Sequence, residues 1–280
     1  MINIELKDNL EFMKTIDSNL IDCIYSDILY GTGRDFIQYK DLKAIRSDIE
    51  EHYIPRIKEM YRILKDTGSI YLQMDMKINH WLRIIMDDIF GYNNFRSELI
   101  WCYSVQGYSK DNYSAKHDTI LYYCKSNKFT FNLESIREKL PSETTIDRFL
   151  KTSLKNKGYY NGKTKKWVDI ENEEDFYLKH KGHPPYSWFN LGVLTASDKE
   201  RSCGDYPTQK PKELIKRFLL ASTNENDLVA DFYLGSGTTA VVCKELNRSF
   251  IGCDINPYSI ELTNKRLNEI KNYNENIFEF

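Results

Sequence analysis

Residues 227–254 restrict the possible folds of this chain more than any other stretch, and they read DLVADFYLGSGTTAVVCKELNRSFIGCD. An apolar run at 227–233 leads into a glycine-rich turn, a helical stretch follows at 238–246, and a second apolar run occupies 249–254. Strand, turn, helix and strand in this order form a βαβ unit, which joins two parallel strands. We therefore expect an α/β fold of the Rossmann type, with helices on both faces of a mostly parallel, twisted sheet.

The turn in this unit, GSGTTA, has the spacing of a nucleotide-binding loop. Gly235 and Gly237 let a ligand approach the backbone. Asp254 lies nineteen positions beyond Gly235, at the end of the next strand, where an acidic side chain accepts hydrogen bonds from ribose hydroxyls. The pattern by itself suits NAD, FAD or S-adenosylmethionine.

Two neighbouring features favour S-adenosylmethionine. Asp231 lies four residues before Gly235, and a carboxylate there suits the cationic end of an amino acid better than a pyrophosphate. Just upstream, Thr208, Gln209 and Lys210 offer hydroxyl, amide and ammonium groups to the carboxylate end of the donor. The alternatives remain that Asp231 is a turn residue, Thr208 a helix cap and Lys210 a surface charge.

The rest of the chain alternates strands with helices, apart from one irregular segment. At 280 residues with 41% hydrophobic side chains, the chain can bury a sizeable core. Residue patterns predict strands at 3–5, 20–25, 69–75 and 98–104, a strand, turn and strand at 117–131, and helices at 9–16, 47–65 (stopped by Gly68) and 78–91. The periodicity weakens after about residue 133 and returns near 203. We expect a catalytic half at 1–132, an insertion at 133–202 and a donor-binding half at 203–280.

Residues 151–167 of this insertion are rich in lysine, with aromatic residues between the lysines. This stretch contains no acidic residue. This composition suits contact with nucleic acid phosphates, and we expect Lys163, Lys165 and Lys166 to make such contacts. The alternative is a solvated surface loop, because runs of charge usually face water.

Composition narrows the remaining classes of protein. No apolar run reaches the roughly 18 to 20 residues of a membrane helix, and the N-terminus MINIELKDNL is too charged for a secretory signal. The six cysteines form no C-x-x-C pair, so neither a disulfide framework nor a metal site is expected. These features indicate a cytoplasmic protein with no membrane partner.

The stretch SDILYGTG, residues 26–33, follows the apolar strand at 20–25. Taken alone, it is a strand that ends in a turn, where Asp27 caps the next element and Tyr30 packs at an edge. The chain also contains YPTQKP, then DFYLGSGTT, then FIGCD, all downstream of DILYGTGRDF. In this order the motifs resemble the permuted β-class of DNA amino-methyltransferases, in which the catalytic motif comes first and the donor-binding motifs last.

The resemblance covers nearly the whole chain except about 133–200, where the family has its variable target-recognition region. It implies transfer of a methyl group from S-adenosylmethionine to an exocyclic amino group in double-stranded DNA, with the target base flipped out of the duplex. Asp27 and Tyr30 become the catalytic pair, with the backbone carbonyl of Ile28 as a second acceptor for the amino group. The residues that carry over as donor contacts are Asp231, Tyr233, Gly235, Ser236, Gly237, Thr238, Asp254, Thr208, Gln209 and Lys210.

An aspartate at position 27 favours adenine N6 as the target, whereas family members that methylate cytosine N4 more often have serine there. The resemblance also implies two candidate partners, a second copy of the chain and a cognate restriction endonuclease. The chain departs from the family's usual D-P-P-Y and D-P-F motifs, because Ile28, Leu29 and Phe232 replace prolines. Each replacement frees a backbone N–H and the φ angle, so we expect both turns to be less pre-organised.

Four alternative functions therefore remain open. An N4-cytosine methyltransferase or an RNA methyltransferase would keep the fold, and a catalytically degenerate DNA-binding subunit would explain the lost prolines. A nucleotide-dependent oxidoreductase would account for GSGTTA but not for SDILY or TQKP.

Overall fold

The computed structural model describes residues 1–34, 41–138, 150–161, 164–172, 184–195, 197–201, 206 and 208–276, with side chains as far as residue 270. The chain forms two compact units, and each is described by itself. One comprises Met1–Asn132 and Ser187–Phe280, and the other comprises Leu133–Tyr186. The expected insertion at 133–202 therefore extends too far at its C-terminal end, because residues 188–190 pair with the sheet of the large unit.

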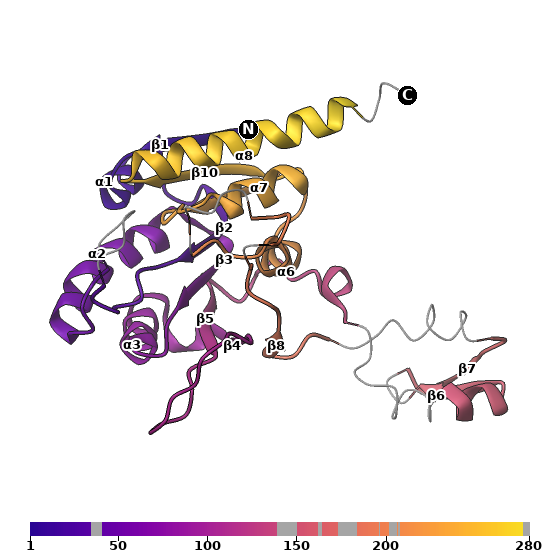
Figure 1. Cartoon of the computed structure of the whole chain (residues 1–280). Coiled ribbons are helices and arrows are strands. Elements are labelled where there is room, and N and C mark those ends of the chain that lie inside the picture. Colours follow the sequence, from indigo (N-terminus) through magenta and orange to yellow (C-terminus); the bar gives the residue numbers. More distant parts are fainter. Residues whose placement is uncertain are drawn as a thin grey trace. The chain divides into compact units, whose positions relative to one another are not determined.

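In its described part, the large unit is built on an eight-stranded sheet with the order β1-β10-β9-β2-β3-β5-β4-β8 (Figure 1). The strands are β1 (Ile2–Leu6), β2 (Ile21–Asp27), β3 (Leu64–Met74), β4 (Phe95–Cys102), β5 (His117–Cys124), β8 (Trp188–Asn190), β9 (Leu228–Asp231) and β10 (Ser249–Asp254). β5 is antiparallel to both of its neighbours, and all other pairings in this sheet are parallel. The mostly parallel sheet is as expected.

Helices cover both faces of this sheet (Figure 1). They are α1 (Asn9–Met13), α2 (Arg46–Ile63), α3 (Asn79–Phe90), α6 (Lys212–Ser222), α7 (Thr238–Glu245) and α8 (Pro257–Asn276), and short 3₁₀ helices lie at Tyr92–Asn94 and Leu133–Ile136. Strand side chains alternate between faces, so Ile24 packs in the core with α1, α2 and α3, whereas Cys23 and Tyr25 pack with α6, α7 and α8. The sheet is therefore buried on both sides, as parallel sheets normally are.

The sheet places a late strand beside an early one. β9 pairs in parallel with β2, with Cys23 opposite Val229 and Ile24 opposite Ala230. β2 and β9 therefore end at the same edge, at Asp27 and Asp231. Ligands of open α/β folds bind at the carboxyl ends of the strands, so this pairing forms the floor of a site from two distant parts of the sequence.

Three expected elements differ in the structure. The helix expected at 47–65 ends at Ile63, and β3 begins at Leu64, so Gly68 lies within a strand and does not stop the helix. The expected strand, turn and strand at 117–131 forms only β5, because the residues after Cys124 are bends and coil. The helix expected at 9–16 ends at Met13.

The small unit contains a helix at 150–155 and an antiparallel pair, β6 (Gly158–Asn161) and β7 (Lys166–Asp169). Its described core is small and consists of Leu150, Tyr159 and Ile170. None of the described helices in either unit is both long and apolar enough to cross a membrane.

Candidate active site

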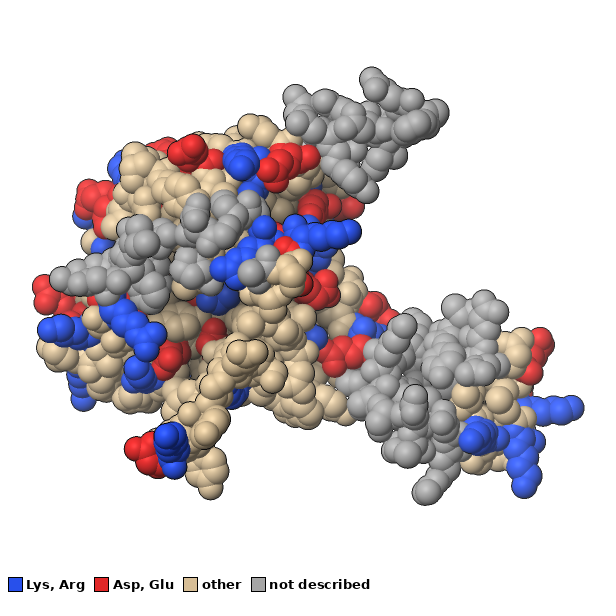
Figure 2. Space-filling model, viewed as in Figure 1, with Lys and Arg blue, Asp and Glu red and all other residues tan. Residues whose placement is uncertain are grey.

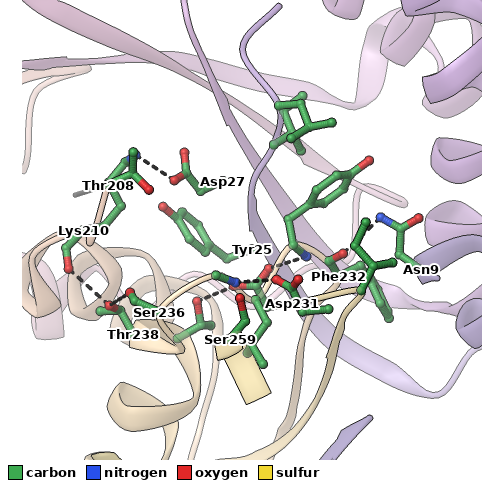
Figure 3. A pocket seen from close by; sticks show the side chains of 18 of the residues that line it. Asn9, Tyr25, Asp27, Thr208, Lys210, Asp231, Phe232, Ser236, Thr238 and Ser259 are labelled. Carbon is green, nitrogen blue, oxygen red and sulfur yellow. Dashed lines mark hydrogen bonds and ion pairs between the residues drawn. The ribbon is translucent and has the colours of Figure 1, made fainter. Parts of the chain in front are cut away.

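A cavity of about 320 Å³ opens at the carboxyl ends of β2, β9 and β10 (Figure 3). It is a small-molecule pocket at the sheet edge where α/β folds bind ligands. All the residues that line it belong to the large unit. Asp27, Asp231 and Asp254 line it at the ends of these three strands.

Asp27 lies beside Tyr30 and Lys210 in this cavity. The Tyr30 hydroxyl oxygen lies within hydrogen-bond distance of Asp27 Oδ1, at 2.8 Å, and Lys210 Nζ lies 2.6 Å from Asp27 Oδ2 (Figure 3). Burial raises the pKa of the Asp27 carboxyl, and the nearby Lys210 ammonium opposes that shift. Lys210, which we expected to bind the donor's carboxylate, pairs instead with the predicted catalytic residue in this structure.

The backbone after Asp27 separates two carbonyl groups that looked equivalent in the sequence. The Leu29 carbonyl accepts a hydrogen bond from the Tyr53 hydroxyl at 2.8 Å. The Ile28 carbonyl receives no hydrogen bond from any described residue, although Ile28 lines the cavity. This leaves the Ile28 carbonyl as an acceptor for a substrate amino group, the role that we expected for it.

Two of the three N–H groups that replace proline nitrogens are hydrogen-bonded. Ile28 N donates to the Gln73 carbonyl at 3.1 Å, and Phe232 N donates to Ser26 Oγ at 3.2 Å. Both bonds link the turns to neighbouring strands. At these two positions, hydrogen bonds restrain the backbone that a proline ring would otherwise restrain by fixing φ. The expectation of less pre-organised turns stays a prediction, and Leu29 N, the third freed N–H group, donates to no described residue.

A polar network behind Tyr30 was missed in the sequence. Asp118, on β5, accepts from the Tyr30 hydroxyl at 2.6 Å and from the Tyr103 hydroxyl at 2.9 Å. Gln73, on β3, donates to Tyr30 at 3.1 Å and to Asp118 at 2.8 Å. Asp118 is 4% exposed and Gln73 is fully buried. The available signal was a charged residue and an amide within apolar strand patterns, since such groups are rarely buried without partners.

The glycine turn adopts the conformation that its sequence predicts. Gly235 and Gly237 have φ angles of +53° and +73°, and a Cβ on Gly237 would lie 2.2 Å from Thr263 Oγ1. Arg266, which is 4% exposed on α8, donates to the Ser236 carbonyl at 2.6 Å and to Thr238 Oγ1 at 3.1 Å. Only glycine fits at position 237, and α8 holds the turn from behind.

The two acidic residues around the turn accept hydrogen bonds from the backbone. Asp254 accepts from Gly235 N and Asn256 N, both at 2.9 Å. Asp231 accepts from Thr239 Oγ1 at 2.6 Å and from Tyr233 N at 3.1 Å. Burial raises the pKa of Asp231 to about 7, against the effect of these bonds. Each carboxylate oxygen has a second lone pair, so Asp254 can still accept from a ribose.

Comparison with known proteins identifies the family. The sequence profile of a family described as DNA methylase (N6_N4_Mtase) matches residues 21–265, most of the chain. The chain belongs to this DNA methylase family. The Type II methyltransferase M.HpaI of Haemophilus parainfluenzae is 35% identical over 92% of this chain and 71% of its own.

Two further similarities support the assignment. The DNA adenine methyltransferase YhdJ of Escherichia coli (strain K12) is 28% identical over 95% of this methylase and 82% of its own chain. The solved structure of PvuII DNA methyltransferase (cytosine-N4-specific) has a TM-score of 0.66 at 14% identity, covering 95% of this chain and 86% of that one. The latter likeness supports the methyltransferase fold.

The methyl donor of this methylase is S-adenosylmethionine, and the cavity fits it chemically. Ile255 lines the cavity beside Asp254 and is 67% exposed, so it offers an apolar surface for a purine ring next to an acceptor for ribose hydroxyls. The hydroxyls of Thr208, Ser236 and Thr238 line the cavity as well. These groups match a ligand with an apolar base, a sugar and a polar amino-acid end.

Most of the predicted donor contacts lie on the cavity wall, with two exceptions. Thr208, Lys210, Asp231, Tyr233, Gly235, Ser236, Thr238 and Asp254 line it. Gln209 does not, because its Nε2 donates to the Glu200 carbonyl at 2.9 Å. Gly237 also lies outside the lining and supports the turn. Asn9, His52 and Arg56 line the cavity too, although no motif marks them, and only the folding of β1, α1 and α2 brings them there.

The predicted DNA contacts belong to the small unit. Lys165 is the turn residue before β7, Lys166 begins β7, and both are exposed. Figure 2 shows basic side chains gathered on this unit. Lys163 lies outside the described residues.

Proposed function

We propose that this methylase methylates the exocyclic N6 of adenine in double-stranded DNA, within a specific sequence and on a base flipped out of the duplex. The observation that carries the proposal is an aspartate carboxylate beside a free backbone carbonyl at the cavity. These two acceptors suit an exocyclic amino group, which has two hydrogens to donate. The likeness to YhdJ, named as a DNA adenine methyltransferase, supports adenine as the base.

The amino nitrogen of adenine is a poor nucleophile because its lone pair is delocalised into the ring. Asp27 and the Ile28 carbonyl would each accept one amino hydrogen, so that the nitrogen pyramidalises and directs its lone pair at the methyl group. Bound S-adenosylmethionine supplies an electrophilic methyl group on a sulfonium. Tyr30 would stack on the flipped base, a contact of about 1 to 3 kcal/mol.

The experiment that tests this function is nucleoside mass spectrometry of DNA treated with the wild type and with Asp27→Ala. We expect N6-methyladenine from the wild type and a loss of order 10²-fold or more in rate for Asp27→Ala. Unchanged donor binding by the variant would show that the loss is catalytic. Wild-type rates from Asp27→Ala would remove Asp27 from the mechanism.

N4-methylation of cytosine is the second candidate function. The fold is shared with PvuII DNA methyltransferase, which is named as cytosine-N4-specific, and the same two acceptors suit that amino group. N4-methylcytosine from the wild type in the same assay would decide for this candidate. Methylation profiling of DNA from a host that expresses the chain would identify the target sequence.

Three further proposals concern the setting of this activity. Residues 133–186 form a compact unit of their own, and we propose that they recognise the target sequence.

The relatives named as Type II methyltransferases support a restriction-modification system with a cognate restriction endonuclease in the cytoplasm. A homodimer is proposed from the family resemblance, and sedimentation analysis tests it.

A further inference from the structure

The hydroxyl of Tyr30 lies between two carboxylates. Its oxygen is 2.8 Å from Asp27 Oδ1 and 2.6 Å from Asp118 Oδ2. A phenol carries a single hydrogen and can donate to only one of them at a time. The second short contact therefore needs another hydrogen, which a protonated carboxyl group supplies.

The orientation of the Gln73 side-chain amide indicates which of the two carboxyl groups carries that hydrogen. The Tyr25 hydroxyl donates to Gln73 Oε1 at 2.7 Å, so Gln73 Nε2 faces Tyr30 and Asp118 and donates to both. With Tyr103 donating to its other oxygen, Asp118 is surrounded by donors and acts as an acceptor. Asp27 is therefore the carboxyl group that gains the hydrogen and donates it to the Tyr30 oxygen.

The reaction supplies such a proton. As the new N–C bond forms and the methyl–sulfur bond breaks, the bonding electron pair stays on sulfur and the amino nitrogen must lose one hydrogen as a proton. We propose that Asp27 accepts this proton and shares it along a path through the Tyr30 hydroxyl to Asp118. In the loaded path, Asp27 donates to Tyr30 and Tyr30 donates to Asp118. This inference rests on the proposed function and assigns Asp118 as a positioning residue.

The charged and polar groups around Asp27 shift its pKa in opposite directions. Burial is the main cause that raises the pKa of Asp27; Lys210 and the Tyr30 hydroxyl lower it, and Asp118 raises it further. The titratable groups that face the pair from the surrounding strands and loops are Lys210, Tyr25, Tyr30, Tyr103, Asp75 and Asp231. The Asp27 side chain is 22% exposed, so the proton can pass to water after the product leaves.

Single-turnover rates across the pH range test the path with Asp118→Asn, Tyr30→Phe and the double variant. We expect each single variant to lose about tenfold or more of the plateau rate, within the usual range for proton transfer by a positioned group. The KM for DNA should change by less than about twofold, because the ring of Tyr30 still stacks. The double variant should be no slower than the slower single variant, because both act in one path. In Asp118→Asn, the acid limb of the plot of rate against pH should also move to lower pH, because the Asp118 charge that raises the pKa of Asp27 is lost.

A readout independent of turnover follows the carboxyl group itself. Infrared difference spectra of the whole protein should show an acid C=O band at low pH that disappears in Asp27→Asn. In Tyr30→Phe this band should move to the position of a carboxyl without that hydrogen-bond acceptor. A band that Tyr30→Phe leaves unchanged would overturn the path.

The matched control is Tyr123→Phe, which removes another tyrosine-to-aspartate hydrogen bond, of 2.6 Å to Asp87, outside the cavity lining. It should leave rates and spectra unchanged. An unaltered plateau in Tyr30→Phe, or losses that multiply in the double variant, would contradict the proposal. If the wild type methylates cytosine, the adenine assignment fails but the path is still tested, because that amino group loses the same proton.

Discussion

At the scale of single residues, burial determines the chemistry of this site more than residue type does. The cavity is lined by three aspartates, and their environments differ. Asp27 is paired with Lys210, Asp254 holds two backbone N–H groups, and Asp231 is 2% exposed and has a pKa of about 7. Identical side chains can therefore serve as catalytic group, loop support and titrating group.

We expect Asp231 to make donor binding depend on pH. Since a cationic ligand favours the ionised carboxylate, bound donor should lower the pKa of Asp231, and binding near neutral pH should release a proton. Affinity for S-adenosylmethionine should therefore fall by up to about tenfold for each pH unit below about 7. Calorimetry in buffers with different ionisation enthalpies measures the proton release directly. Equal affinity across this pH range would mean that the ionisation of Asp231 is not coupled to donor binding.

The same group affects stability in a defined direction. Its pKa is raised in the folded state, so between about pH 4 and 7 the folded protein binds more protons than the unfolded chain. The contribution of Asp231 to stability is therefore fully present below its unfolded pKa and is lost as pH rises towards 7. Asp231→Asn should remove this part of the pH dependence, as measured by denaturant unfolding.

At the scale of elements, hydrogen bonds between strands replace two prolines. The Ser26 hydroxyl oxygen accepts a hydrogen bond from Phe232 N at 3.2 Å, and Ser26 is fully buried. Ser26→Ala would leave that N–H without its partner, so we expect a loss of about 1 to 3 kcal/mol in the free energy of unfolding. In a Phe232→Pro background, which lacks this N–H, Ser26→Ala should cost less than it does in the wild type. If Ser26→Ala costs the same in both backgrounds, the bond to Phe232 N is not what Ser26 contributes.

The glycine turn offers a second prediction at this scale. Gly237→Ala places a methyl group at a φ of +73° and within 2.2 Å of Thr263 Oγ1. The conformation alone costs about 1 to 2 kcal/mol, and the clash adds to it, so the melting temperature and donor affinity should both fall. Gly192→Ala is the control, because a Cβ there meets no atom within 4 Å. Equal melting temperatures for the two variants would contradict this account of the turn.

At the scale of the whole molecule, the cavity and the lysines proposed to contact DNA belong to different units of the chain. Formal net charge is only −2, so DNA binding must depend on local basic surfaces such as the lysines of the small unit. Figure 2 shows basic and acidic side chains interspersed on the viewed face of the large unit. Phosphate contacts hold a protein in register but carry no sequence information themselves.

Replacing Lys165 and Lys166 with alanine should therefore weaken binding to all duplexes about equally. Each lost phosphate contact should make the slope of log affinity against log salt shallower by about 0.9. Fluorescence anisotropy at several salt concentrations measures both effects, with Lys265→Ala on α8 as an exposed control. Unchanged affinity and slope would show that these lysines only face solvent.

Local sequence determined the fold class and much of the site. The glycine turn, its flanking strands and the acidic residue beyond it follow from backbone geometry that few residue patterns satisfy. Asp27, Asp231 and Asp254 were predicted in this way, because each lies at the end of a strand. The family resemblance supplied their roles.

Tertiary structure alone decided which of these groups meet. β2 and β9 are about two hundred residues apart in the chain but pair in the sheet. Lys210, just before α6, likewise meets Asp27 only in the folded chain. Asp118 and Gln73 lie within apolar strand patterns, and no local signal shows that their side chains converge on Tyr30. Strand order and register depend on packing over the whole sheet, so the network around Tyr30 becomes visible only once the chain is folded.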